Sequence, residues 1–326
     1  MSYDQEQKAA QIAFFGAEKG GGTFGNKVYD FVLKEPYHLD NLYPPLRKDI
    51  LAYFEATPIK WWRGVAGGPT NLMIATQIAC LNHLYWLHDQ PKAATAFLQQ
   101  LRADWQAVPF ASGRYVEFEY NGCGDDQAVN LLGERSSQRG VDSTGFSAAF
   151  LAEDADGVRE LVAIEWRYCE KYYQKAAVMD DDDPLYVSRR AKLRSLLTAA
   201  DCPVFLERGQ EQAAVDYEAA FQKFAVEPFY TTLLETLLAW QMAKAKIERI
   251  SGWRYIQVIP DGNILLRQGE TSKAITQGQA DITAGWRSYL REPERYKAFD
   301  HKALVEPIVR RYVPQLAEYL QKRYWQ

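Results

Sequence analysis

The chain has 326 residues, of which 47% are hydrophobic and 25% are charged, as is usual for a globular protein. Its formal net charge of -4 argues against a protein that binds nucleic acid through overall positive charge. No apolar run approaches the roughly 18 residues that a membrane-spanning helix needs, and the N-terminus lacks the basic start and apolar stretch of a secretory signal. We therefore expect a cytoplasmic protein with no membrane partner.

Cysteine and histidine spacing excludes the common zinc sites. The four cysteines contain no CxxC pair, and the four histidines contain no HExxH pattern. Any metal in this protein is therefore expected to be bound by carboxylates, which favours Mg²⁺ or Mn²⁺.

The N-terminal third is predicted to be helical after a flexible start. Residues 1–28 are expected to form a flexible segment, because their glycine-rich run at 20–25 lacks the Gly-Lys-Ser/Thr ending of a phosphate loop. Residues 44–110 show helical spacing, with buried or amphipathic helices predicted at 72–87 and 93–108.

Residues 112–175 are predicted to form the β core. The aromatic-rich run 114–120 alternates, which suits a strand or a helix end. Residues 147–151 and 161–168 are predicted to be strands, separated by a hairpin-type turn at 154–157.

Residues 185–326 are predicted to be mainly helical, with one strand near 253–260. Since no repeat or low-complexity linker divides the chain, residues 29–326 are interpreted as a single domain. The expected fold class is α/β (α+β), with a mixed β-sheet core flanked by many helices. Helices are predicted at 189–199, 212–224, 230–247, 282–290 and after 304.

The strand predicted at 161–168 has two unlike faces. Glu165 and Arg167 share one face with Leu161 and Ala163, whereas the other face is entirely apolar or aromatic. Burying a carboxylate or a guanidinium unpaired is costly, so both must be paired, solvated or bound to an ion. A simple ion pair on a half-exposed sheet face is one interpretation.

A second acid precedes the neighbouring strand. If the two strands pair across the turn at 154–157, Asp142 and Glu165 converge, although the sequence alone leaves the register open. Two carboxylates at one point can hold Mg²⁺, which lowers the pKa of a bound water and neutralises charge on a phosphodiester. A neighbouring cation then stabilises the transition state.

These residues resemble a known signature. The order of these residues is similar to the PD-(D/E)XK phosphodiesterase motif: Asp142 is followed by about twenty residues that include an Asp-Gly turn, and then by the run IEWRY at 164–168. The run IEWRYCEKY at 164–172 resembles more particularly the PGN_0703-type restriction endonuclease-like proteins, which tend to read IE-x-KY-x-E-x-Y. Further similar parts extend the resemblance over roughly residues 60–305; they are residues 71–84, Phe118-Glu119, residues 230–241 and the strand ending at Pro260.

The resemblance implies a restriction-endonuclease-like fold and a metal-dependent endonuclease that acts on DNA, of restriction or defence type. It implies Mg²⁺ or Mn²⁺ ligands at Asp142, Glu165 and Glu119, with Glu117 as a competitor for the place of Glu119. Arg167 takes the place of the catalytic lysine.

The arginine is a departure from the family pattern. The arginine side chain is broader than that of lysine, planar and essentially never neutral, so it offers positive charge but no deprotonated amine. Its guanidinium group can instead form an ion pair with Glu165. Lys171 is a substitute or a plain surface lysine. Three interpretations therefore stay open: an active nuclease, a nuclease fold that only binds nucleic acid or protein, and an unrelated helical scaffold with an ion pair.

Basic runs supply candidates for DNA contact, although such runs are commonly solvated helix faces. A homo-oligomer and a partner subunit both remain open. The candidate basic residues are Arg189, Arg190, Lys192 and Arg194, and separately Arg287, Arg291, Arg295 and Lys297.

Overall fold

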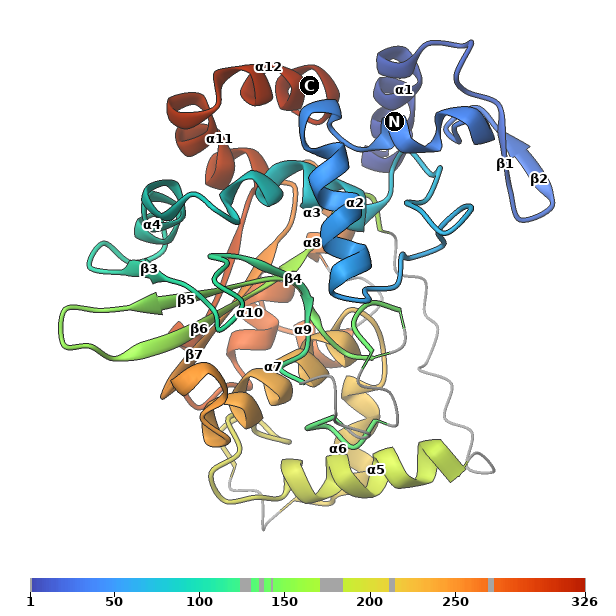
Figure 1. Ribbon diagram of the computed structural model, residues 1–326. Helices are drawn as coiled ribbons and strands as arrows, with labels where there is room; N and C mark the ends of the chain where they lie inside the picture. Colours follow the sequence, from blue (N-terminus) through green and yellow to red (C-terminus); the bar gives the residue numbers. More distant parts are fainter. Residues whose placement is uncertain are drawn as a thin grey trace.

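The computed structural model describes residues 2–123, 130–134, 138–141, 143–170, 184–210, 215–268 and 273–325, with the side chains of 184–189 left out. Its centre is a six-stranded mixed sheet in the order β3-β5-β6-β7-β8, with β4 pairing to β5 beside β3 (Figure 1). The strands are β3 (Gln106–Val108), β4 (Glu117–Tyr120), β5 (Phe146–Glu153), β6 (Arg159–Trp166), β7 (Gly252–Val258) and β8 (Tyr296–Phe299).

Strands β5 and β6 form the hairpin that the sequence predicted. They pair antiparallel from Ala148↔Ile164 to Glu153↔Arg159, and the turn at 154–157 joins them. Strand β7 then pairs parallel to β6, and β8 parallel to β7. A parallel neighbour needs a crossover, and here the chain between β6 and β7 includes helix α7 (Phe229–Lys244).

The alternation predicted for residues 161–168 is confirmed by two separate cores. Val162, Ile164 and Trp166 belong to one core, whereas Leu161 and Ala163 belong to the other. Helices therefore cover both faces of the sheet, as Figure 1 shows. The first core contains residues of α2 (Arg47–Ala56), α3 (Thr76–Leu84), α4 (Pro91–Gln99), α11 (His301–Tyr312) and α12 (Pro314–Arg323), and the second contains residues of α5 (Pro184–Leu197), α6 (Tyr217–Phe224), α7, α8 (Ile264–Gln268), α9 (Lys273–Thr276) and α10 (Ile282–Arg287).

The N-terminal segment differs from the flexible stretch that we expected. It contains helix α1 (Tyr3–Phe15) and the two-stranded sheet of β1 (Gly22–Phe24) and β2 (Lys27–Tyr29). Gln11 on α1 accepts a hydrogen bond from Arg323 Nε at 2.9 Å and donates to the Arg323 carbonyl at 2.8 Å. The buried face of α1 carries polar side chains, so hydrophobic periodicity did not reveal it. Gly22 lies so close to the Leu33 carbonyl that a Cβ would stand 2.1 Å from the oxygen, and this close approach requires a glycine.

Three short strands also differ from the predicted pattern. The helix expected at 93–108 ends at Gln99, and the strand β3 follows it. The run 114–120, which suited a strand or a helix end, contains the strand β4. The strand β8 was not predicted. Strands of three or four residues are too short to show periodicity. In the described part of the chain, no helix combines the length and apolarity that a membrane crossing requires.

Candidate active site

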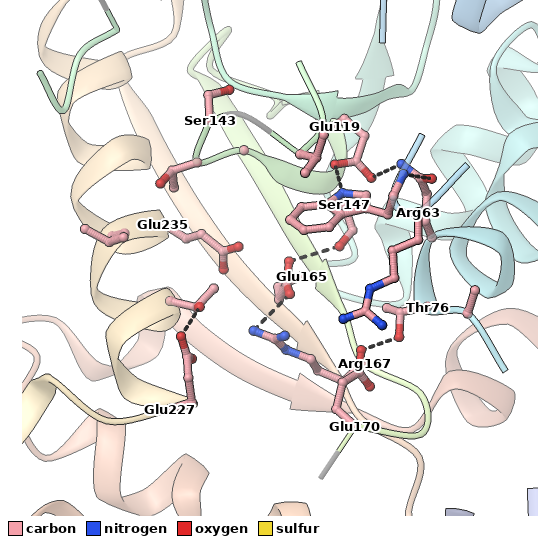
Figure 2. A pocket seen from close by; sticks show the side chains of 18 of the residues that line it. Arg63, Thr76, Glu119, Ser143, Ser147, Glu165, Arg167, Glu170, Glu227 and Glu235 are labelled. Atoms are coloured by element: carbon pink, nitrogen blue, oxygen red, sulfur yellow. Dashed lines mark hydrogen bonds and ion pairs between the residues drawn. The ribbon is translucent and has the colours of Figure 1, made fainter. Parts of the chain in front are cut away.

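A cavity of about 690 Å³ opens where β4, β5 and β6 meet helices α3 and α7. Figure 2 shows acidic side chains entering it from several of these elements. One part of its wall is acidic, and another part is apolar. The acidic side chains are Glu119, Glu134, Glu165, Glu170, Glu227 and Glu235, and the apolar ones include Leu72, Ile74, Ala75, Val141 and Leu234.

Strand register brings three of the lining residues into one row. The pairs Phe118↔Ala148 and Tyr120↔Phe146 flank Glu119 on β4 and Ser147 on β5, and the Ser147 hydroxyl contacts Glu165 on β6 at 2.9 Å. Since neighbouring strands lie about 4.8 Å apart, residues in such a row lie side by side. Glu119 itself has a φ of 48°, a left-handed conformation that is costly for a residue with a Cβ. Such strain gathers at functional sites.

Glu165 contacts both Ser147 and Arg167. Its Oε2 accepts a hydrogen bond from Ser147 Oγ at 2.9 Å, and its Oε1 lies 3.0 Å from Arg167 Nη2. Ser147 Oγ in turn accepts the Trp166 amide at 3.0 Å, which fixes the direction of the hydroxyl. Burial raises the pKa of Glu165, and the opposing effects of Arg167, Glu235 and Ser147 do not offset it.

Glu235 is a site residue that the sequence analysis missed. It comes from α7, where its side chain points toward Glu165 (Figure 2), and its carboxyl is hydrogen-bonded to Glu165 and to the Tyr255 hydroxyl. Burial, followed by the charge of Glu165, raises the pKa of Glu235 well above its ordinary value. Two buried carboxyls in contact do not both ionise, so the pair holds one proton between them. The available signal was a lone acid inside the apolar run LLETLL at 233–238.

Glu119 lines the cavity, whereas Glu117 does not. Trp62 Nε1 donates to Glu119 Oε2 at 3.1 Å, and Gln77 Nε2 donates to Oε1 at 2.9 Å. Burial raises the pKa of Glu119 to about 7, despite these two hydrogen bonds. Glu117 instead accepts from Tyr53 Oη at 2.7 Å and from Arg139 Nη2 at 2.8 Å, away from the cavity.

Asp142 lies outside the described residues, as do Lys171 and Tyr172. The residues on either side of Asp142, Val141 and Ser143, both line the cavity. Glu170 also lines it and accepts hydrogen bonds from the Thr76 hydroxyl and, at 2.6 Å, from the Tyr168 amide.

The donor chemistry of this site fits a hard divalent cation, because its charged ligands are carboxylates. Among the residues that the structure describes, however, no three His, Cys, Asp or Glu side chains are grouped closely enough to form a metal site. Glu165 and Glu119 are therefore two candidate ligands of such a cation.

The two basic runs singled out in the sequence do not line the cavity as far as the structure describes them. Arg190 and Arg194 pair with Glu218, and Arg291 Nε donates to the Cys202 carbonyl at 2.8 Å. Arg295 pairs with Glu292 at 2.8 Å, and Lys297 Nζ donates to the Leu101 carbonyl at 3.3 Å. The arginines that do line the cavity are Arg63 and Arg167.

Comparison with known proteins identifies the family of the chain. No curated protein and no solved structure was found to match the chain. A family model described as "Restriction Endonuclease associating with ARP" matches residues 8–325. The finer resemblance to the PD-(D/E)XK motif and to the PGN_0703-type proteins stays a prediction. Because the match spans nearly the whole sequence, the chain belongs to the restriction-endonuclease family REase-ARP.

Proposed function

We propose that this protein is a metal-dependent phosphodiesterase that hydrolyses DNA, with Asp142, Glu165 and Arg167 as a PD-(D/E)XK centre. The observation that carries the proposal is the placement of Glu165 and Arg167 side by side at the end of β6, facing a cavity of about 690 Å³. Val141 and Ser143 line the same cavity, as a role for Asp142 in that centre requires. Membership of a family described as restriction endonucleases supports a restriction or defence role.

The chain order supports a restriction-endonuclease-like core. Strands β4, β5 and β6 are consecutive antiparallel neighbours, and α7 leads to β7, which pairs parallel to β6. Of the candidate acids, Glu119 on β4 and Glu165 on β6 line the same cavity, and Asp142 precedes β5 in the sequence. This convergence is what a nuclease centre with a carboxylate-bound metal needs.

In this proposal Asp142, Glu165 and Glu119 hold Mg²⁺ or Mn²⁺. When bound, the cation lowers the pKa of a water and neutralises charge on the scissile phosphate. Ser147 holds the Glu165 carboxylate in place, and the carboxyl of Glu235 orients it from the helix side. The Arg167 guanidinium supplies fixed positive charge where the pentacovalent phosphate becomes more negative.

Nicking of supercoiled plasmid DNA tests the proposal. The protein is expected to cut with Mg²⁺ or Mn²⁺ and to stop on addition of EDTA, and Glu165→Ala is expected to abolish cutting. Cutting that Glu165→Ala leaves unchanged would reject the assignment and point to a contaminating nuclease.

A second candidate function is a nuclease-fold binding module without catalysis. The 3.0 Å contact of Arg167 Nη2 with Glu165 Oε1 favours it, because this ion pair uses a carboxylate oxygen that a metal would need. The partner would be DNA or a protein, and the family description names an association with ARP. Tight binding without cleavage, unchanged by EDTA, would support this candidate over the first.

A further inference from the structure

Trp62 is unusual among the residues around the cavity, because it is 45% exposed and yet held in place. It lies in the segment between α2 and α3 and lines the cavity. The ring of its neighbour Trp61 already has a stacking partner, because it stacks on Phe54 with 3.8 Å between the ring centroids. The indole of Trp62 has no stacking partner of this kind among the described ring contacts.

Two hydrogen bonds hold Trp62, and a third joins its two partners. Its indole Nε1 donates to Glu119 Oε2 at 3.1 Å, and its backbone amide donates to Gln77 Oε1 at 3.1 Å. Gln77 Nε2 closes the ring of contacts by donating to Glu119 Oε1 at 2.9 Å. The indole is therefore ordered before any ligand arrives, so a ligand that stacks on it does not bear the entropic cost of ordering it.

The surroundings of Trp62 suit a nucleotide. Arg63 is exposed, has a φ of 52° and, as Figure 2 shows, extends its guanidinium into the cavity toward Thr76. Leu72, Ile74 and Leu234 provide an apolar wall nearby. A cavity of about 690 Å³ lies in the range of sites for whole small molecules, and a backbone phosphate alone does not fill it.

We infer that Trp62 is a stacking platform for a nucleobase that has left its own base stack, with Arg63 at an adjacent phosphate. This inference rests on the proposed function and specifies its substrate: a strand with an unstacked base beside the cleaved bond. A base of this kind comes from single-stranded DNA or from a base extruded out of a duplex, and both present the same free aromatic face.

Oligonucleotides that carry 2-aminopurine test the inference, because stacking on an indole quenches this base. Binding is measured in EDTA, so that cleavage plays no part, with a single strand, a matched duplex and a duplex in which 2-aminopurine is mispaired. The variants are Trp62→Phe and Trp62→Leu. Both lose the hydrogen bond to Glu119, but only leucine loses the aromatic face, so their difference reports stacking alone.

The expected result is quenching with the wild type, and affinity for the unstacked probes roughly 10- to 100-fold weaker in Trp62→Leu than in Trp62→Phe. Quenching of the single strand and of the mispaired duplex identifies which source supplies the base. Equal affinity of the two variants, or binding of every probe with no change in 2-aminopurine fluorescence, would overturn the inference while leaving plasmid cleavage by the protein intact. Absence of binding to every probe would overturn it as well.

Arg63→Ala is expected to weaken binding of the same probes and to reduce its salt dependence. Arg311→Ala is the matched control. Both arginines are exposed and lie over an aromatic ring, Arg63 at 5.1 Å from the Phe24 centroid and Arg311 at 5.4 Å from the Tyr312 centroid, but Arg311 is not part of the cavity wall. An equal loss of affinity in both variants would show that Arg63 acts only through general charge, against the inferred position at a phosphate. Thermal unfolding of each variant verifies that the fold is kept.

Discussion

Glu165 on β6 and Glu235 on α7 share a hydrogen bond between their carboxyl groups, and both side chains are buried in the wall of the cavity. Tyr255, on the neighbouring strand β7, donates to Glu235 from the other side. The acidic end of the β5–β6 hairpin is thus anchored to the helix that follows it, and a buried proton is part of the structure.

Substitutions of Glu235 test how much the hydrogen bonds of this protonated carboxyl pair contribute to stability. Glu235→Gln keeps a donor for Glu165 and an acceptor for Tyr255, so we expect stability within about 1 kcal/mol of the wild type at pH 7. Glu235→Leu leaves both partners buried without their hydrogen bonds and is expected to cost about 2 to 4 kcal/mol. Urea unfolding measures both values; a leucine variant as stable as the glutamine variant would show that the hydrogen bonds contribute nothing.

Arg167 carries a positive charge at the position where the PD-(D/E)XK motif has a lysine. If the charge acts at the phosphate, Arg167→Lys is expected to keep DNA cleavage within about tenfold of the wild type, because lysine retains the positive charge. Arg167→Met is expected to lower the cleavage rate at least about 100-fold. Single-turnover rates at saturating Mg²⁺ measure the difference, and a methionine variant that cuts normally would remove Arg167 from the mechanism.

Glu119 is expected to make stability depend on pH. Burial raises its pKa to about 7, so the folded protein binds this proton more tightly than the unfolded chain does. Stability should therefore fall as pH rises from about 4.5 to 7 and stay at its lower value above that range.

Glu119→Gln removes this dependence. Without metal, we expect the variant to be about 2 kcal/mol more stable than the wild type at pH 8, since relief of the buried charge exceeds the loss of one hydrogen bond. The gain should vanish near pH 5. Glu55→Gln, at an exposed position, is the control, and a gain of equal size at both pH values would contradict the account.

Arg323 ties the two ends of the chain together. It is fully buried and donates to the Asn41 carbonyl at 2.7 Å and to Gln11 Oε1 at 2.9 Å. Arg323→Met would leave these acceptors unsatisfied, with an expected cost of about 3 kcal/mol or more. Protease digestion should then cleave α1 faster than in the wild type, whereas Arg310→Met, on the exposed face of α11, should not change the cleavage rate.

Much of the centre of the fold was predictable because its strands are long and two-faced. The alternation around Val162 and Ala163 predicted the faces of β6 correctly, and the turn at 154–157 predicted the hairpin. The short strands β3 and β8 were missed, because three or four residues give no periodic signal. Helix α1 was missed because its buried side, including Gln11, is polar.

The site was predictable only in part. The unlike faces of 161–168 identified Glu165 and Arg167 as neighbours, and they lie 3.0 Å apart. The competition between Glu117 and Glu119 depended on strand register and on the left-handed φ of Glu119, which sequence spacing does not reveal. Glu235 and Trp62 reach the cavity from elements distant in sequence, so only the tertiary fold brings them to Glu165.

Divalent metal binding at Glu165 is the central claim, and crystals soaked in Mn²⁺ test it most directly. The account predicts an anomalous peak in the cavity within about 2.0 to 2.6 Å of a Glu165 carboxylate oxygen, and its loss in Glu165→Gln. A cavity without a peak at saturating Mn²⁺, with Arg167 still paired to Glu165, would contradict the claim and leave the binding module as the function.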